Sequence, residues 1–247
     1  DKGLYSIIQP FIGTNILRPL FSGINFDKNG ITVTDAHKLI TLPYPNSKYD
    51  GVYKSDLSKK KEQNQITIAD EYSNYAQIIP RENSITSSYK ISVYKLLQYT
   101  KVAVKYANKI TKQIVFKAGD EKVSYNGEYL IDVLTTLLKL GHETIWFHYV
   151  APNKASLFTP KKEYELGNDE IFLLMPVMMG SNQIYFGAED IDFNRKLSVY
   201  YDFATDEIYN ADGSLVEFKM NYKNNVVIPE EDVKLLKKLT SEKKHSN

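Results

Sequence analysis

The sequence predicts an α+β fold, in which antiparallel strands alternate with a few amphipathic helices. An Asn-Gly pair at residues 29–30 separates two β-rich runs. Residues 94–110 and 130–138 each have the apolar spacing of a helix, and each range comes after a strand-like segment. The order of a helix followed by antiparallel strands occurs twice along the chain. With 247 residues, of which 43% are hydrophobic and 25% charged, the chain can bury a core and most simply forms two compact units.

The first part of the chain is predicted to form one helix followed by strands. Apolar residues spaced at i, i+3, i+4 and i+7 between 3 and 12 predict a short amphipathic helix. Residues 19–27 and 31–34 are predicted to form a hairpin, because Asn29 and Gly30 between them both tolerate positive φ. Further strands are predicted at 39–42, 51–53 and 65–69.

The middle of the chain repeats this plan. A strand at 89–93 leads into a helix at 94–110, and a second helix beginning near Leu130 is expected to stop at Gly141. Strands are predicted at 113–117, 144–150, 155–158 and 171–175. The inward face of the first helix is predicted to carry Leu96, Tyr99, Ala103, Tyr106 and Ile110.

The last part of the chain is predicted to form short strands and one final helix. Short strand-like segments predict a small β meander, and Pro229, followed by acidic residues and then by lysines, predicts a final helix that agrees with its own dipole. The meander segments are 183–186, 197–203, 207–209 and 215–220.

Composition limits the classes of function. A formal net charge of +1 provides no global field towards nucleic acid, so any DNA contact must come from a local patch. The chain has no cysteine, which excludes disulfides and thiolate metal sites but leaves the redox compartment open. No apolar run approaches the roughly 20 residues that span a bilayer. The chain begins at Asp1 without an initiator Met, so a removed targeting peptide remains an open alternative.

Catalytic chemistry has little support in the sequence. His37 beside Asp35 has the residue types of a base with an orienting carboxylate, but no nucleophile motif, phosphate-binding glycine loop or metal-ligand spacing accompanies the pair. We therefore expect no catalytic residue, no metal and no cofactor. An enzyme of unrelated function is the weakest of the alternatives, and a metal or cofactor bound at His37 would support it.

Lysines recur every fourth residue along one face of the helix predicted at 94–110. Lys101, Lys105 and Lys109 form this row. Such a row is typical either of a helix face exposed to solvent or of a helix that contacts the phosphate backbone of nucleic acid.

Four short strings resemble the bacterial DNA polymerase III β sliding clamp family, and they occur in the family's order across residues 3–179. Residues 34–39, Thr-Asp-Ala-His-Lys-Leu, are similar to the family's Thr-Asp-Gly-His-Arg-Leu motif after a strand pair. Residues 75–80 resemble the junction between the middle and last domains. Residues 125–134 resemble its Phe-Asn-x-x-Tyr-Leu helix start, and residues 173–177 its terminal Met-Pro strand.

The resemblance implies a DNA-clamp (processivity-fold) architecture, with antiparallel sheets and inner helices that line a DNA channel. It implies clamp-like domains at 1–80 and 81–180, followed by an extension at 181–247 that carries the meander and helix. Its implied role is a cytoplasmic, non-enzymatic scaffold on double-stranded DNA that holds a polymerase or other clamp-binding protein by a short linear motif. The implied DNA-facing residues are Lys95, Lys101, Lys105 and Lys109. The implied peptide-binding residues are Thr34, Ala36, His37, Lys38, Leu39, Pro80, Leu174, Met175, Pro176 and Val177.

The chain departs from the family pattern in several places. Ala36 replaces the Gly, Met178 and Met179 replace a terminal Arg-Leu, two inter-motif intervals are short, and no first domain is present. A ring of six domains would take three copies of this chain. The alternative is a clamp-derived interaction module that forms no ring, in which residues 180–247 mask a surface or recruit a partner.

Overall fold

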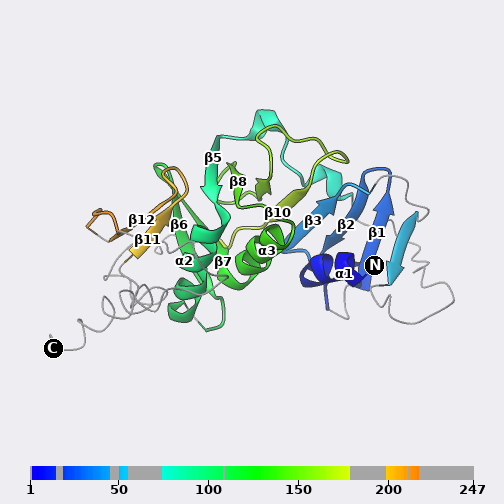
Figure 1. Cartoon of the computed structure of the whole chain (residues 1–247), viewed down its shortest axis with the longest axis horizontal. Helices are drawn as coiled ribbons and strands as arrows, with labels where there is room; N and C mark the ends of the chain where they lie inside the picture. Colours follow the sequence, from blue (N-terminus) through cyan, green and yellow to red (C-terminus); the bar gives the residue numbers. More distant parts are fainter. Residues whose placement is uncertain are drawn as a thin grey trace.

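The computed structural model describes residues 2–14, 19–44, 50–54, 74–107, 109–178, 199–210 and 212–216. These residues form an eight-stranded sheet and a four-stranded sheet, so the predicted α+β class is confirmed. Figure 1 shows helices α1, α3 and α2 following one another along one side of the strands. Within the described ranges, no helix combines the length and the apolar character that crossing a membrane requires.

The first part of the chain supplies one half of the large sheet. The predicted helix is α1 (Lys2–Ile8), continued by a 3-10 turn at Gln9–Phe11. The predicted hairpin is also present, and Gly30 has a φ of +108°, the left-handed conformation that the Asn-Gly pair predicts. The strands of this half are β1 (Gly23–Asp27), β2 (Gly30–Thr34), β3 (Lys38–Leu42) and β4 (Gly51–Lys54).

The second part supplies the other half of the large sheet and two longer helices. β3 pairs antiparallel with β10, so the large sheet runs without interruption from one half into the other. Its strand order is β4-β1-β2-β3-β10-β9-β8-β5. The added strands are β5 (Ser87–Ser92), β8 (Thr144–Tyr149), β9 (Ser156–Thr159) and β10 (Ile171–Leu174).

Helices α2 (Val93–Tyr106) and α3 (Gly127–Lys139) pack against each other and begin at polar caps. Ser92 and Asn126 each accept a hydrogen bond from a backbone N–H in the first turn of their helix. Gly141 has a φ of +89° just after α3, as predicted. The predicted extent of α2 was wrong at its end, because the backbone turns extended at Ala107 and leaves Ile110 90% exposed.

The four-stranded sheet has a topology that the sequence did not predict. β6 (Gln113–Ala118) and β7 (Glu121–Asn126) form a hairpin, and β11 (Val199–Asp202) lies parallel to β6 with β12 (Glu207–Asn210) outside it. Residues 214–216 return along β12, which makes the described part of the predicted meander. The strands predicted at 65–69 and 183–186, residues 217–220 and the final helix lie outside the described residues.

Alternation along the strands sends side chains to two separate apolar cores. The main core lies on the helix side and includes Ile40, Phe172 and Leu174, together with Tyr201 and Phe203 from the β11–β12 hairpin. A smaller group, which we call the outer cluster, lies on the other face of the large sheet. It consists of Leu39, Tyr75, Ile79, Ala155, Leu157, Ile171 and Leu173, with Tyr164 and Leu166 packed against it.

Candidate functional site

Two sequence motifs that are far apart in the chain meet at the centre of the large sheet. Leu39 of β3 lies opposite Leu173 of β10, and Lys38 lies opposite Leu174. Immediately after β10, the Met175 N–H donates a hydrogen bond of 2.8 Å to the carbonyl oxygen of His37. The Thr-Asp-Ala-His-Lys-Leu loop and the Met-Pro segment are therefore direct neighbours.

The loop between β2 and β3 is held by its own polar side chains. One Asp35 carboxylate oxygen accepts the N–H groups of His37 and Lys38, both at 2.9 Å, and the Thr34 hydroxyl donates to the Lys38 carbonyl at 2.8 Å. Ala36 has a φ of +76°, a conformation that glycine adopts without the steric cost of a Cβ. The loop therefore presents His37 on a fixed backbone.

Lys38 is a buried cation at the junction of the two halves. Its side chain is 4% exposed, and its Nζ lies 2.5 Å from Asp132 Oδ2 of α3 and 3.4 Å from Asp35 Oδ2. The ammonium also lies 4.6 Å from the centre of the Tyr129 ring. This ion pair connects the first half of the molecule to helix α3.

A cavity of about 380 Å³ opens beside this ion pair on the helix side of the sheet. His37 is exposed and stacks on Tyr129, with ring centres 5.2 Å apart and planes 19° from parallel. Pro10 and Phe21 add apolar wall, and Asp35 and Lys38 add polar groups. The exposed lining of this hollow is more polar than apolar, so it offers hydrogen-bond partners beside an aromatic and apolar wall to a short peptide or a small ligand.

The residues implied by the clamp resemblance do not all reach this cavity. Leu174 is fully buried in the main core, and Thr34 is 4% exposed with its hydroxyl used inside the loop. Leu39 points to the opposite face, where it is fully buried in the outer cluster. Side-chain alternation along β3 explains the division, because Lys38 and Leu39 are consecutive.

The segment after β10 remains accessible. Met175 is 38% exposed and Met178 is 66% exposed, while Pro176 and Val177 are half-buried. The Val177 N–H donates to the Ser124 carbonyl of β7 at 2.8 Å, which leads the segment away from His37. Pro80 is half-buried on the other side of the sheet, where its carbonyl accepts a 2.7 Å hydrogen bond from the Tyr164 hydroxyl.

Comparison with solved structures identifies this arrangement of strands and helices. The chain matches a sliding clamp from Bacillus subtilis over 72% of its own length and 62% of the clamp, with a TM-score of 0.55 and 18% identity. It matches a clamp from Pseudomonas aeruginosa over 72% and 65%, with a TM-score of 0.56 and 14% identity. A clamp from the same organism bound to griselimycin matches over 71% and 63%, with a TM-score of 0.53 and 14% identity.

The chain has the sliding-clamp fold. It spans less than two thirds of the length of these clamps. Neither a protein-family model nor a curated protein sequence matches it.

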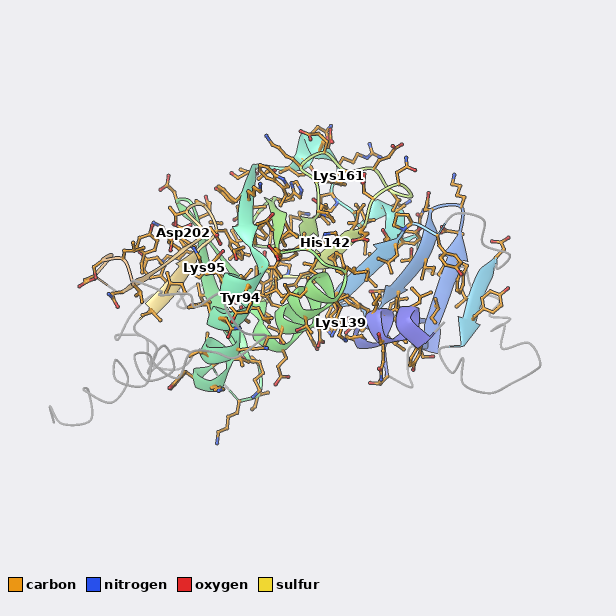
Figure 2. All side chains as sticks on the ribbon, viewed as in Figure 1. Tyr94, Lys95, Lys139, His142, Lys161 and Asp202 are labelled. Carbon is orange, nitrogen blue, oxygen red and sulfur yellow. The ribbon has the colours of Figure 1, made fainter. Side chains whose placement is uncertain are left out.

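The lysines implied to face the channel of the clamp fold occupy different environments. Lys105 is exposed on α2 and Lys101 is half-exposed, whereas Lys109 lies in the turn beyond the helix. Lys95 is 13% exposed and donates to Glu207 Oε1 at 2.9 Å and to the Asp206 carbonyl at 2.6 Å. Figure 2 shows Lys95 beside the β11–β12 hairpin, so we remove it from the DNA-facing set.

Sequence reasoning missed three residues that shape this part of the clamp fold. Tyr129 and Asp132 face the β2–β3 loop from α3, and Tyr164 packs against the outer cluster. The helical period at 127–139 placed both α3 residues off the apolar stripe, but nothing in the sequence indicated what they contact. Among the described residues, no group of three His, Asp or Glu side chains is arranged to hold a metal ion.

Proposed function

We propose that this protein is a clamp-like scaffold that associates with DNA in the cytoplasm and holds a partner protein by a short linear motif. The observation that carries the proposal is the pairing of β3 with β10, which brings His37 and Met175 together at a junction between the two halves. The fold, which is that of sliding clamps, supports a scaffold and not an enzyme.

The partner surface consists of the His37 cavity and the neighbouring Met175 side chain. His37 and Tyr129 offer a stacking face, and the flexible, polarizable Met175 adapts to different apolar side chains. A clamp of this fold has been solved bound to griselimycin, which supports the presence of a ligand-binding surface on the fold.

A labelled peptide of the Gln-x-x-Leu-x-Phe type is expected to bind at micromolar concentration. His37→Ala combined with Met175→Ala is expected to weaken binding about tenfold, because each change removes apolar contact worth roughly 0.5–1.5 kcal/mol. Fluorescence anisotropy titration measures the effect. Ile110→Ala is the matched control, because Ile110 is an exposed apolar side chain in the turn after α2. Equal affinity in the double variant and the control would remove this site assignment.

Non-specific DNA association is the second part of the proposal. Helices α1, α3 and α2 lie along one side of the sheet, and Lys101 and Lys105 project from α2 without an ion pair to any described residue. Lys101→Glu with Lys105→Glu is expected to lower duplex affinity about tenfold and to reduce the salt slope by roughly two. Lys154→Glu is the control, since Lys154 is exposed in the β8–β9 connection. A salt slope unchanged from wild type would contradict a role for this face.

Whether copies of the chain close a ring decides between the two forms of the scaffold. Three copies would provide six domains if residues 1–80 and 81–180 each act as one clamp-like domain. Light scattering after size-exclusion chromatography, with and without primed DNA, distinguishes a trimer from a monomer. A monomer under both conditions favours the interaction module without a ring.

A further inference from the structure

Two of the peptide-binding residues implied by the clamp resemblance, Leu39 and Pro80, lie at the outer cluster and not at the His37 cavity, which is on the opposite face of the sheet. We take the outer cluster as a second, apolar half of the partner site, and it is closed in this structure. Leu39 and Leu173 face each other across the β3–β10 pair on this side of the sheet, and they are 0% and 1% exposed. The side chains packed against their cluster from outside are Tyr164 and Leu166. Both belong to residues 160–170, the connection between β9 and β10.

This connection crosses from the second half of the molecule to the first. The Tyr164 hydroxyl donates to the Pro80 carbonyl at 2.7 Å, and its ring lies 5.1 Å from the ring of the buried His148. A Cβ built on Gly167 would lie 3.3 Å from Asn29 Cα in the β1–β2 turn. Figure 2 shows Lys161 on the side of the strands away from α2 and α3.

The connection has a preformed shape of its own. Lys161 Nζ lies 2.6 Å from Asp169 Oδ1, and the second Asp169 oxygen accepts the Glu165 N–H at 3.0 Å. The Asn168 and Asp169 N–H groups both return to the Glu165 carbonyl, at 3.1 and 2.9 Å. Gly167, with a φ of +94°, provides the tight bend between them. The shape of the connection is therefore supported by bonds that do not depend on the outer cluster.

Contacts to the second half hold both ends of the connection, with Lys162 Nζ 5.4 Å from the centre of the Trp146 ring and Glu170 Oε2 2.6 Å from His142 Nε2, while its contacts to the first half are fewer. Tyr164 and Leu166 are only partly buried. Among the described residues of the connection, Tyr164 alone makes a hydrogen bond to the first half, which is the bond to the Pro80 carbonyl. Burial raises the pKa of the Tyr164 hydroxyl to about 12, which keeps it protonated as a donor. A segment with few buried contacts opens locally at lower free-energy cost than the core.

We propose that residues 160–170 form a strap that closes the apolar half of the site over Leu39 and Leu173, and that Tyr164 occupies the place of a partner's apolar anchor. This inference rests on the proposed peptide-binding function for the identity of the competitor, while closure itself is independent of any partner. A closed strap lowers the apparent affinity for a peptide by the fraction of molecules that are open.

Closure is tested by thiol labelling, because the chain contains no cysteine and an introduced one is the only thiol. Leu39→Cys and Ala155→Cys each report on the outer cluster, Ala155→Cys being the smaller change. Adding Tyr164→Ala is expected to speed labelling at either position at least tenfold. Lys162→Ala is the matched control, since Lys162 lies in the same strap but over the Trp146 ring. Val123→Cys in the main core must stay protected in the Tyr164→Ala background.

Labelling within twofold of the parent at both reporters would overturn the strap. Labelling that rises equally at Val123→Cys would also overturn it, because that result indicates global unfolding instead of local opening.

Peptide titration then tests competition. Tyr164→Ala is expected to tighten binding of the Gln-x-x-Leu-x-Phe peptide five- to tenfold, and Lys162→Ala is expected to leave it unchanged. Wild-type binding that Tyr164→Ala does not improve overturns the competition and leaves the proposed function intact. Absence of binding to every variant refutes the proposed function, while the thiol result still decides whether the strap closes.

Discussion

Phe203→Ala is expected to lower the free energy of unfolding by about 3–5 kcal/mol. Phe203 is fully buried, stacks on Phe147 with ring centres 3.8 Å apart, and lies 5.3 Å from the Phe116 ring. The substitution leaves a cavity where the β11–β12 hairpin enters the main core. Since domains are typically stable by about 5–15 kcal/mol, the loss is a large part of the total.

Urea unfolding followed by circular dichroism measures this loss. Thr205→Ala is the matched control, because Thr205 is exposed in the same turn and its replacement is expected to stay within about 0.5 kcal/mol of wild type. Equal stabilities for the two variants would show that the hairpin contributes little to the core.

The ion pair between Lys38 and Asp132 is expected to have the second largest effect. Asp132→Asn leaves the Lys38 ammonium buried with only Asp35, at 3.4 Å, as a described acidic partner. We expect a loss of about 2 kcal/mol, below the 3–5 kcal/mol of fully buried pairs, because the Asp132 side chain is 37% exposed. Lys38→Met removes the same attraction and retains apolar contact with the Tyr129 ring.

A double-mutant cycle measures the interaction energy between Lys38 and Asp132 separately from the contacts that each residue makes with its other neighbours. The double variant is expected to lose about 1–2 kcal/mol less than the sum of the single variants, measured by urea unfolding. Glu128→Gln is the control on the same helix, since Glu128 is 60% exposed and 3.7 Å from Lys112. Strict additivity would mean that the two charges do not interact.

Local signals in the sequence predicted most of the fold. The β1–β2 hairpin follows from Asn29 and Gly30, and the end of α3 follows from Gly141, because both depend on backbone conformations that few residues adopt. The end of α2 was misjudged because the apolar period continues to Ile110, although the chain leaves the helix at Ala107. Strand β7 was missed because residues 121–126 contain only two apolar side chains, Val123 and Tyr125, and so short an alternation does not by itself indicate a strand.

The candidate site could be predicted only in part. The family resemblance placed His37 and Met175 together, and the β3–β10 register is consistent with that expectation. The resemblance did not show that the side chains of the consecutive residues Lys38 and Leu39 lie on opposite faces of one sheet. Nor could it place Tyr164, whose contacts with Pro80 and the outer cluster depend on the path of a connection without periodic signal.

The parallel contact between β6 and β11 constrains the order in which the molecule can assemble. The Gly119 N–H bonds to Asp202, 83 positions later in the chain. During translation, β6 and β7 therefore leave the ribosome long before the strand that completes their sheet has been synthesised. Until then, an open edge next to Phe116 can pair with other nascent chains. Slow late-stage maturation and a need for chaperone protection are the expected biosynthetic consequences.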